Sequence, residues 1–346
     1  MTRITNKMMT NKYLYNMRNN LSTMTTYQNQ LSTGKKITRP SDNPFVSRRN
    51  RQMENEISEN TQYNTNINYG SNYLTTTDTA LAQAGNVLSR IKELMVKAGD
   101  GSYSQDQIAT INKEVEEKTK ELGQILNTTF DGSYIFGGTK STTKPVTWDE
   151  DGNIAYADDE GKGFGNDNFT GTTLTDTAKI TKEKEKIEKN LNIEISQGVT
   201  IQYSKTAVDI LEFNDPKTGN DVNVMTTLSE TLKNLSSLSQ DDETPSGLPT
   251  KTAAYDYIHN EGLSKMDAII QNLLTNRSEV GTLQNRMTSA QQTNEDQNYN
   301  MTDILSNSED IDFTETTMNF YVAQTVYTAA LQTSSKVLMN TIMDYI

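Results

Sequence analysis

Apolar residues recur at alternating steps of three and four near both ends of the chain. Near the N-terminus they are Leu14, Met17, Leu21, Met24, Gln28 and Leu31, with Gln28 as the polar exception. Near the C-terminus the same spacing runs through Val280, Leu283, Met287, Ala290, Asn294, Gln297, Met301 and Ile304. Such spacing puts one stripe along one side of each helix, as in a coiled coil. We therefore expect the two ends to pair as helices and the middle to form a separate outward lobe.

Helical patterns account for most of both terminal regions. They predict helices over residues 1–33, 45–98, 105–127, 222–238, 252–307 and 313–343. Pro40 and Pro44, in TRPSDNP, predict a sharp loop before the second helix because proline disrupts a helix interior. Inside that helix the stripe is interrupted by polar residues, which weaken a coiled coil but help to select its register. These residues are Asn60, Asn64, Ser71 and Asp78. An acidic break at 306–312 offers Ser308 as a cap for the last helix.

The middle of the chain follows a different period. Asp131-Gly132 predicts a hairpin, and alternating residues predict further hairpins over 146–156 and 192–203. The apolar residues at 208–213 predict one more strand, 158–178 a loop, and 179–190 a short exposed helix or a solvated connector. The expected fold is mainly α with a β-containing insert: an elongated coiled-coil helical bundle from both termini and an α+β or β middle domain. The expected segments are 1–139, ending in a hairpin, 140–251 facing outward, and 252–346 packing with the N-terminal helices.

Composition narrows the functional classes. Of the 346 residues 33% are apolar, which suits helices that bury only a narrow stripe. The net charge of -13 argues against nucleic-acid binding, because phosphates require clustered basic residues. The sequence contains no cysteine, which excludes disulfides and thiolate sites. No apolar run reaches the roughly 20 residues that span a bilayer. The first residues have no apolar core of signal-peptide length, so we expect any export to proceed without a cleaved classical signal.

Candidate chemistry is sparse. His259 is the only histidine, so neither a zinc motif nor a Ser–His–Asp set is supported. Asp149 and Asp151 lie in a DxDG run, but the spacing fits a hairpin turn better than a calcium loop. We expect no cofactor, no metal and no enzymatic activity. A basic patch suggests an inter-subunit contact with the acidic residues of 309–312, and it consists of Lys35, Lys36, Arg39, Arg48, Arg49 and Arg51.

Four segments resemble the flagellin superfamily and, within it, the family of hook–filament junction proteins, which are third hook-associated proteins. They are LSTGKKITRPSDNPFV (31–46), residues 62–97, NTTFDGSYIFGGT (127–139) and residues 307–346. The last segment ends in Met343-Asp344-Tyr345-Ile346, as in the junction family. True flagellins usually lack the two-proline form at Pro40 and Pro44. The resemblance covers roughly residues 1–140 and 265–346.

The resemblance implies a structural subunit of the bacterial flagellum that joins a hook-associated ring to the flagellin filament. It implies export by the flagellar secretion apparatus to an extracellular location. The implied partners are the hook-associated ring protein, flagellin, other copies of the chain in a ring and a flagellar export chaperone, with no nucleic acid and no membrane. Two alternatives remain open: a flagellin that forms the filament itself, and a coiled-coil adhesin or secretion-tip protein. An enzyme is the weakest alternative.

The terminal helices and the first loop are the expected assembly interface. The candidate residues are Leu14, Met17, Leu21, Met24, Leu31, Arg39, Pro40, Pro44, Met318, Val322, Val326, Leu338, Ile342 and Ile346.

Overall fold

The computed structural model describes residues 6–217, 219–240 and 249–337. It is mainly helical, with small antiparallel sheets in the middle of the sequence, which confirms the expected fold class. The chain forms two compact units, Met1–Gln62 with Asn294–Ile346, and Tyr63–Thr293. The expected segment boundaries near residues 140 and 251 stay a prediction.

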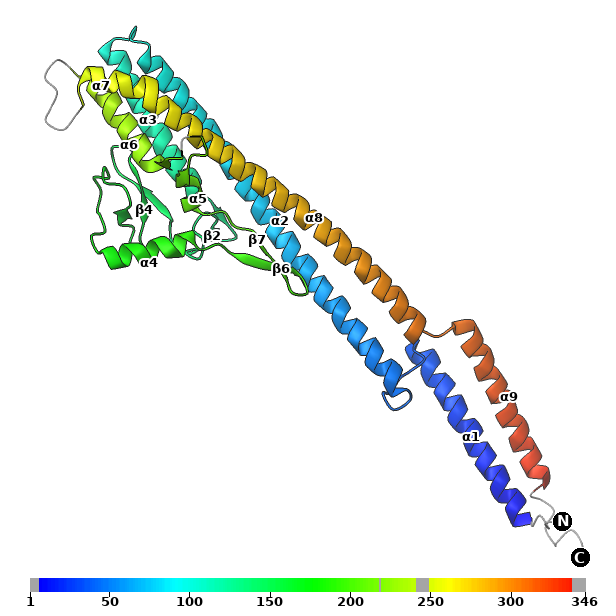
Figure 1. The fold of residues 1–346 in the computed structure, drawn as a ribbon. Coiled ribbons are helices and arrows are strands. Elements are labelled where there is room, and N and C mark those ends of the chain that lie inside the picture. Colours follow the sequence, from blue (N-terminus) through cyan, green and yellow to red (C-terminus); the bar gives the residue numbers. More distant parts are fainter. Residues whose placement is uncertain (1–5, 218, 241–248, 338–346) are drawn as a thin grey trace, which may run out of the picture. The chain divides into compact units, whose positions relative to one another are not determined.

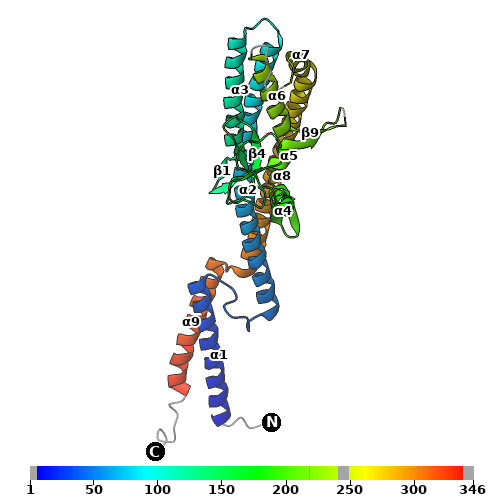
Figure 2. The ribbon, with the colours of Figure 1, turned by 90° about the vertical axis from the view of Figure 1, so that its left-hand side faces the viewer.

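The first unit is built from helices at both ends of the chain. Its elements are α1 (Asn6–Thr33), the beginning of α2 (Pro44–Gly99), the end of α8 (Leu263–Glu309) and α9 (Phe313–Val337). Helix α1 lies beside α9 in both ribbon views (Figures 1 and 2). Helix α2 begins at Pro44 itself. Proline fits there because the N–H groups of the first turn have no acceptor within the helix, so the N–H that proline lacks is not needed. The side chain of Asn43 accepts a hydrogen bond from the backbone N–H of Val46 (3.2 Å) and caps this start.

The C-terminal stripe at 280–304 packs against α2, so the expectation that it would pair with the N-terminal stripe is wrong. Val280, Met287 and Asn294 on α8 are buried. In the first unit, Asn60 of α2 donates a hydrogen bond to Gln297 of α8 (3.4 Å). In the second unit, Arg277 of α8 donates to Asp78 of α2 (3.0 Å). The polar interruptions at Asn60 and Asp78 therefore meet polar partners across this helix pair.

In the second unit, α2 and α8 pack with α3 (Gln105–Leu126), α6 (Val224–Leu238) and α7 (Lys251–Asp256). Their core is continuous and aliphatic, and its fully buried residues include Leu74, Leu81, Leu88, Ile91, Met95, Ile108 and Leu122. A π-helical turn at Tyr257–Gly262 joins α7 to α8. The predicted single helix over 252–307 is therefore divided near its start.

The sheets are short hairpin-based structures. The strand pairs are β1 (Thr129–Phe130) with β2 (Ser133–Tyr134), β6 (Asn192–Ser196) with β7 (Val199–Gln202), and β8 (Glu212–Asn214) with β9 (Asp221–Asn223); β3 (Val146–Trp148), β4 (Ile154–Ala157) and β5 (Gly163–Phe164) form a three-stranded sheet. The three predicted hairpins are confirmed. Asp131 and Gly132 both have positive φ (51° and 76°), as the predicted tight turn requires. Strand β5 lies where only a loop was predicted.

One prediction in the middle of the chain is wrong, and another is confirmed. Residues Ala207–Leu211 form the short helix α5, because Thr206 and Asp209 make a reciprocal capping box that starts a helix. The strand predicted over 208–213 is thus reduced to β8. The short helix predicted over 179–190 is confirmed as α4 (Thr177–Glu188), which is mostly exposed and buries only Glu183 and Ile187.

The cap of α9 also differs from the prediction. The carboxylate of Asp312 accepts hydrogen bonds from the backbone N–H groups of Thr314 (2.9 Å) and Glu315 (3.1 Å). Ser308 still belongs to α8, and its hydroxyl donates to the side chain of Asn50 (2.9 Å). The N-cap residue directly precedes the first helical turn, and Asp312, not Ser308, occupies that position before Phe313.

Candidate assembly surface

The seam between α1 and α9 is a narrow stripe of half-buried side chains. On α1 the seam residues are Tyr13, Met17, Asn20, Met24, Tyr27 and Leu31. On α9 they are Thr316, Phe320, Ala323, Tyr327, Ala330 and Ser334. Both sets follow alternating steps of three and four, as coiled-coil packing requires. The hydroxyl of Tyr13 also donates a hydrogen bond to the backbone carbonyl of Ala330, which ties the two ends of the chain together.

The predicted stripe on α1 splits into two groups in the structure. Met17, Met24 and Leu31 lie in the seam with α9. Leu14 and Leu21 lie beside it and are each 43% exposed. Sequence reasoning missed the seam tyrosines, although Tyr13 and Tyr27 fit the same 3/4 spacing. The helix carries more apolar residues than one seam can cover.

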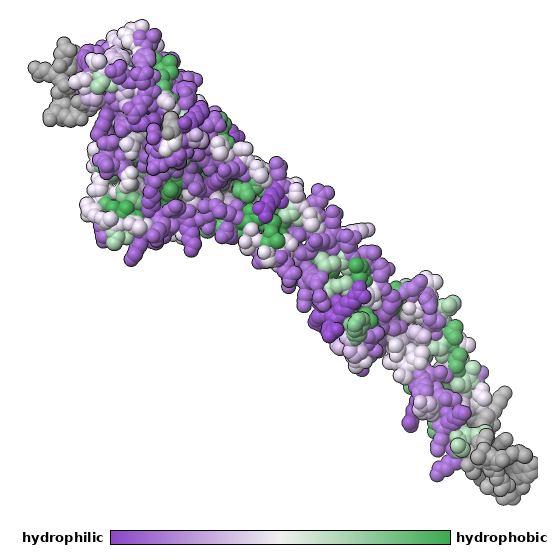
Figure 3. Space-filling model, viewed as in Figure 1, coloured by the Kyte–Doolittle hydropathy of each residue, from purple (hydrophilic) through white to green (hydrophobic). Residues whose placement is uncertain are grey.

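The predicted residues of α9 lie on the side away from the seam. Met318, Val322 and Val326 are 60%, 56% and 48% exposed. They follow one another every four residues and therefore form one continuous outer face. In Figure 3, apolar side chains reach the surface over α9. Exposed apolar faces of this kind mark interaction sites in soluble proteins.

Three further candidates fall beyond the described part of α9. Leu338, Ile342 and Ile346 lie outside the described residues, as does the Met343–Ile346 ending.

The segment after α1 is fastened to the end of α8. The backbone N–H of Lys36 donates to the carbonyl of Glu309 (2.6 Å), and the N–H of Ile311 donates to the carbonyl of Gly34 (3.0 Å). Gly34 has a φ of 73°, the left-handed conformation that ends α1. The ammonium of Lys35 lies 2.5 Å from a carboxylate oxygen of Glu309, and this hydrogen bond raises the pKa of Lys35. The chain thus leaves α1 in one fixed direction.

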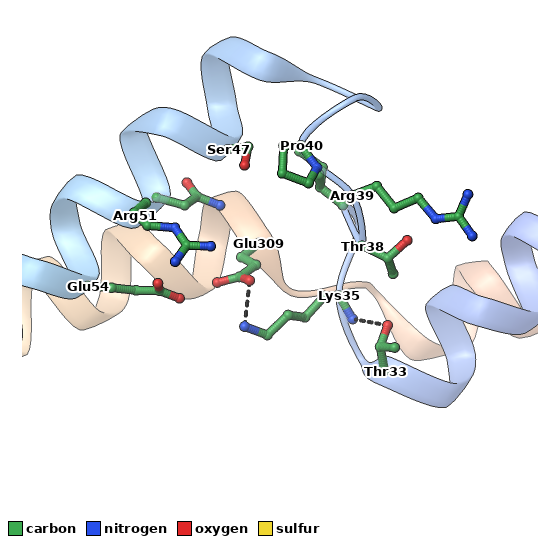
Figure 4. A pocket seen from close by; sticks show the side chains of 11 residues that line it. Thr33, Lys35, Thr38, Arg39, Pro40, Ser47, Arg51, Glu54 and Glu309 are labelled. Carbon is green, nitrogen blue, oxygen red and sulfur yellow. Dashed lines mark hydrogen bonds and ion pairs between the residues drawn. The ribbon is translucent and has the colours of Figure 1, made fainter.

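The two-proline loop borders a cavity of about 260 Å³ (Figure 4). Arg39 and Pro40 both line it, and Pro44, at the start of α2, is exposed. In Figure 4 the side chains of Arg51 and Glu309 point toward each other, whereas the side chain of Arg39 points away from them. The cavity is therefore lined by an inward-pointing arginine of α2, whereas the arginine of the loop points outward.

The basic patch is in part neutralised within the chain. Lys35 pairs with Glu309 of its own chain, so the expected inter-subunit pairing is wrong for these two residues. Asp310 accepts a hydrogen bond from the hydroxyl of Ser306 (2.5 Å), and Asp312 caps α9. The acidic run at 309–312 is thus engaged locally.

The remaining candidates for chemistry have structural partners. The ring Nε2 of His259 lies 2.5 Å from the carbonyl oxygen of Gly99. Asp149 closes the β3–β4 turn by accepting hydrogen bonds from the backbone N–H of Asn153 (2.7 Å) and of Thr170 (2.8 Å). The described residues contain no group of three His, Asp or Glu that would hold a metal ion. Within the same residues, no helix is both long and apolar enough to cross a membrane.

Comparison with known proteins places these helices in a family. The model of the bacterial flagellin N-terminal helical region matches residues 4–141, and that of the C-terminal helical region matches residues 263–345. The chain belongs to the flagellin family. This flagellin-family chain is 25% identical to flagellar hook-associated protein 3 of Escherichia coli strain K12, over 96% of its own length and 95% of the relative. It is a structural subunit of the bacterial flagellum, homologous to hook-associated protein 3.

Two further comparisons bear on the subtype and the fold. The B-type flagellin of Pseudomonas aeruginosa is 32% identical, but the match covers 33% of this chain and 24% of that flagellin. The crystal structure of hook-associated protein 3 from Legionella pneumophila superposes with a TM-score of 0.57 at 14% identity, covering 74% of this chain and 98% of that one. The fold of the flagellin-family chain is therefore that of a solved hook-associated protein.

Proposed function

We propose that this chain joins the flagellar hook to the flagellin filament, contacting a hook-associated ring on one side and flagellin on the other. The observation that carries the proposal is the match to hook-associated protein 3 along 96% of the chain. The match to the B-type flagellin of Pseudomonas aeruginosa covers only 33% of the chain, and this short coverage disfavours a filament-forming role. An adaptor of this kind needs two interfaces with different partners and no catalytic site.

The outer faces of α1 and α9 are the proposed contact surfaces. Leu14 and Leu21 on α1 and Met318, Val322 and Val326 on α9 are between 43% and 60% exposed. Full burial of such a side chain is worth about 1.5–3 kcal/mol, so covering the exposed half of each contributes about 1 kcal/mol. Arg39, Pro40 and Pro44 belong to the same unit and are included in the proposed interface. The assembled subunit is stabilised by contacts that the isolated subunit lacks.

The proposal also includes the steps before and during assembly. The chain is exported through the flagellar channel in a partly unfolded state, and an export chaperone covers its terminal helices until then. Marginal helices favour this route, because a segment that is stabilised mainly by a partner unfolds at low cost. On arrival the chains associate with one another in a ring, and ordering of the helices is coupled to assembly.

Replacement of the chain in its native bacterium by a Val322→Asp variant tests the α9 surface. The matched control is Gln324→Glu, which adds the same charge at an exposed position. Residues two apart lie on opposite sides of a helix, so the control leaves the Met318–Val326 face unchanged. We expect Val322→Asp cells to assemble hooks, to shed flagellin into the medium and to lose motility, whereas Gln324→Glu cells keep their filaments. Electron microscopy and swimming assays give the readout.

The isolated Val322→Asp protein should unfold at the same temperature as the parent, because Val322 is 56% exposed and surface substitutions change stability by about 0.5 kcal/mol or less. Attached filaments in Val322→Asp cells would contradict the proposed surface. Attached filaments in cells that lack the chain altogether would contradict the junction role. Growth of long filaments from the purified chain alone would favour the flagellin alternative.

A further inference from the structure

A groove of about 450 Å³ lies on the outer side of α1, between that helix and the loop that follows it. Leu21 lines it and is 43% exposed, so the groove contains apolar surface. Three cations also line it, Arg18, Lys36 and Arg39, against one acid, Asp42. The groove is thus apolar in part and basic at its edges.

Two of these cations are free to bind a partner. The carboxylate of Asp42 accepts a hydrogen bond from the backbone N–H of Arg39 (3.1 Å), and the ammonium of Lys36 donates to the carbonyl of Asn307 (3.1 Å). The guanidinium groups of Arg18 and Arg39 make no ion pair within the described residues, and both residues are exposed. Guanidinium groups bind carboxylates in a bidentate manner and also stack on aromatic rings. The groove therefore suits a segment that carries carboxylates and an aromatic ring.

Helix α8 carries such a segment on its outer face. Tyr299 is 77% exposed. Asp296 precedes it by three residues and Asp303 follows it by four, so the three side chains share one face of the helix. Both aspartates are exposed and have no ion-pair partner among the residues that the structure describes, although Asp303 accepts a hydrogen bond from Asn307 (3.3 Å). The stripe Asp296–Tyr299–Asp303 matches the groove in charge, and its aromatic ring matches the apolar surface of Leu21.

We propose that the Asp296–Tyr299–Asp303 stripe of one copy docks in the Arg18–Leu21–Arg39 groove of the next copy. The tyrosine ring covers Leu21, and the carboxylates bind the two arginines. This contact deepens the proposed function, because it rests on the ring of copies proposed above.

A second copy is the occupant that the charges favour. The groove and the stripe are different surfaces present on every copy, and two different complementary surfaces generate a head-to-tail interface, which forms a ring when the rotation between copies closes. Each chain has a net charge of -13, so copies repel one another unless opposite charges meet locally. The groove and stripe supply that local contact.

Cysteine cross-linking in assembled flagella tests this contact, because the chain has no cysteine of its own. Ser22 lines the groove, and Asn300 is an exposed neighbour of Tyr299. The native bacterium carries Ser22→Cys, Asn300→Cys or both, and its isolated flagella are treated with copper(II) phenanthroline, which oxidises paired thiols to a disulfide. We expect trimers and higher multimers on non-reducing gels from the double variant only, since one cysteine per chain gives dimers at most.

Tyr299→Ala in the double variant should lower the multimer yield about tenfold, the ratio that corresponds to ~1.4 kcal/mol. Thr302→Ala, at an exposed position of the same helix, is the control and should leave the yield unchanged. Flagella that keep their filaments but give no multimers would overturn the contact and leave the junction role intact. A yield that does not respond to Tyr299→Ala would overturn it as well. Filament retention in cells without the chain would instead count against the junction role, whatever the cross-links.

Discussion

Removal of one buried hydroxyl should destabilise the second unit. Tyr73 on α2 is 2% exposed, and its hydroxyl donates a hydrogen bond to the carbonyl of Ile135 (2.6 Å). Its ring meets Phe130 and Tyr203 edge-on, with centroids 5.8 Å and 4.9 Å away. Tyr73→Phe keeps the ring contacts but leaves the Ile135 carbonyl without its partner in a buried site. Such a loss costs about 1–3 kcal/mol.

Tyr69→Phe is the matched control for this substitution. Tyr69 lies about one turn earlier on α2 and meets the same Phe130 ring edge-on at 5.5 Å. It is 39% exposed, and no hydrogen bond of its hydroxyl occurs within the described residues. Its hydroxyl remains hydrated in both states, so the free energy of unfolding should change by about 0.5 kcal/mol or less.

Urea unfolding, followed by tryptophan fluorescence, measures the difference. The chain has one tryptophan, Trp148 in β3, which lies in the same compact unit as Tyr73. The signal therefore reports on this unit and not on the terminal helices. Equal losses in the two variants, or no loss in Tyr73→Phe, would refute the idea that the Ile135 hydrogen bond ties the β1–β2 region to α2.

Three other substitutions or conditions test the core of the second unit. Burial, with the nearby Glu230 carboxylate as a second cause, raises the pKa of Tyr257. The protonated Tyr257 hydroxyl therefore stabilises the folded state fully below the unfolded pKa of about 10, and this stabilisation is lost as the pH rises toward the folded pKa. Urea unfolding at stepped pH should show stability falling above about pH 10, less steeply in Tyr257→Phe. Lys140→Met should cost about 3 kcal/mol in the same assay, at the low end for a broken buried ion pair, because it removes the ammonium 3.5 Å from the buried carboxylate of Glu183 while Lys186 stays 2.6 Å from that carboxylate. Gly138→Ala should lower the melting temperature strongly, since a Cβ there would lie 2.3 Å from the carbonyl oxygen of Ile187.

The lysine and glycine substitutions each have a control at a more open position. Lys118→Met removes a cation that pairs with Glu121 at the surface, so a change of at most about 1 kcal/mol is expected. Gly161→Ala meets no atom within 4 Å and is strained only by its φ of 83°, which costs about 1 kcal/mol. Equal effects in a variant and its control would contradict the role assigned to burial. An unchanged pH slope in Tyr257→Phe would contradict the assignment of Tyr257.

Local signals predicted most elements and failed where two signals conflicted. Asp131-Gly132 predicted its turn correctly, because positive φ is a local requirement that few residues meet. At 208–213 the apolar residues predicted a strand, but the capping box at Thr206 and Asp209 prevailed over most of that segment. That capping pattern was present in the sequence and would have predicted α5.

The sequence by itself determined that both ends are helical, that the middle contains hairpins and that the chain resembles flagellins, since each of these depends on residues close together or on a shared pattern. Only the tertiary structure decided that α1 pairs with α9 and that the 280–304 stripe pairs with α2. The physical reason is that several helices carry equivalent 3/4 stripes, so spacing alone does not select among partners. The pairing of α1 with α9 half-buries Met17 in the seam and leaves Leu14 and Val322 exposed on faces that the single chain does not cover.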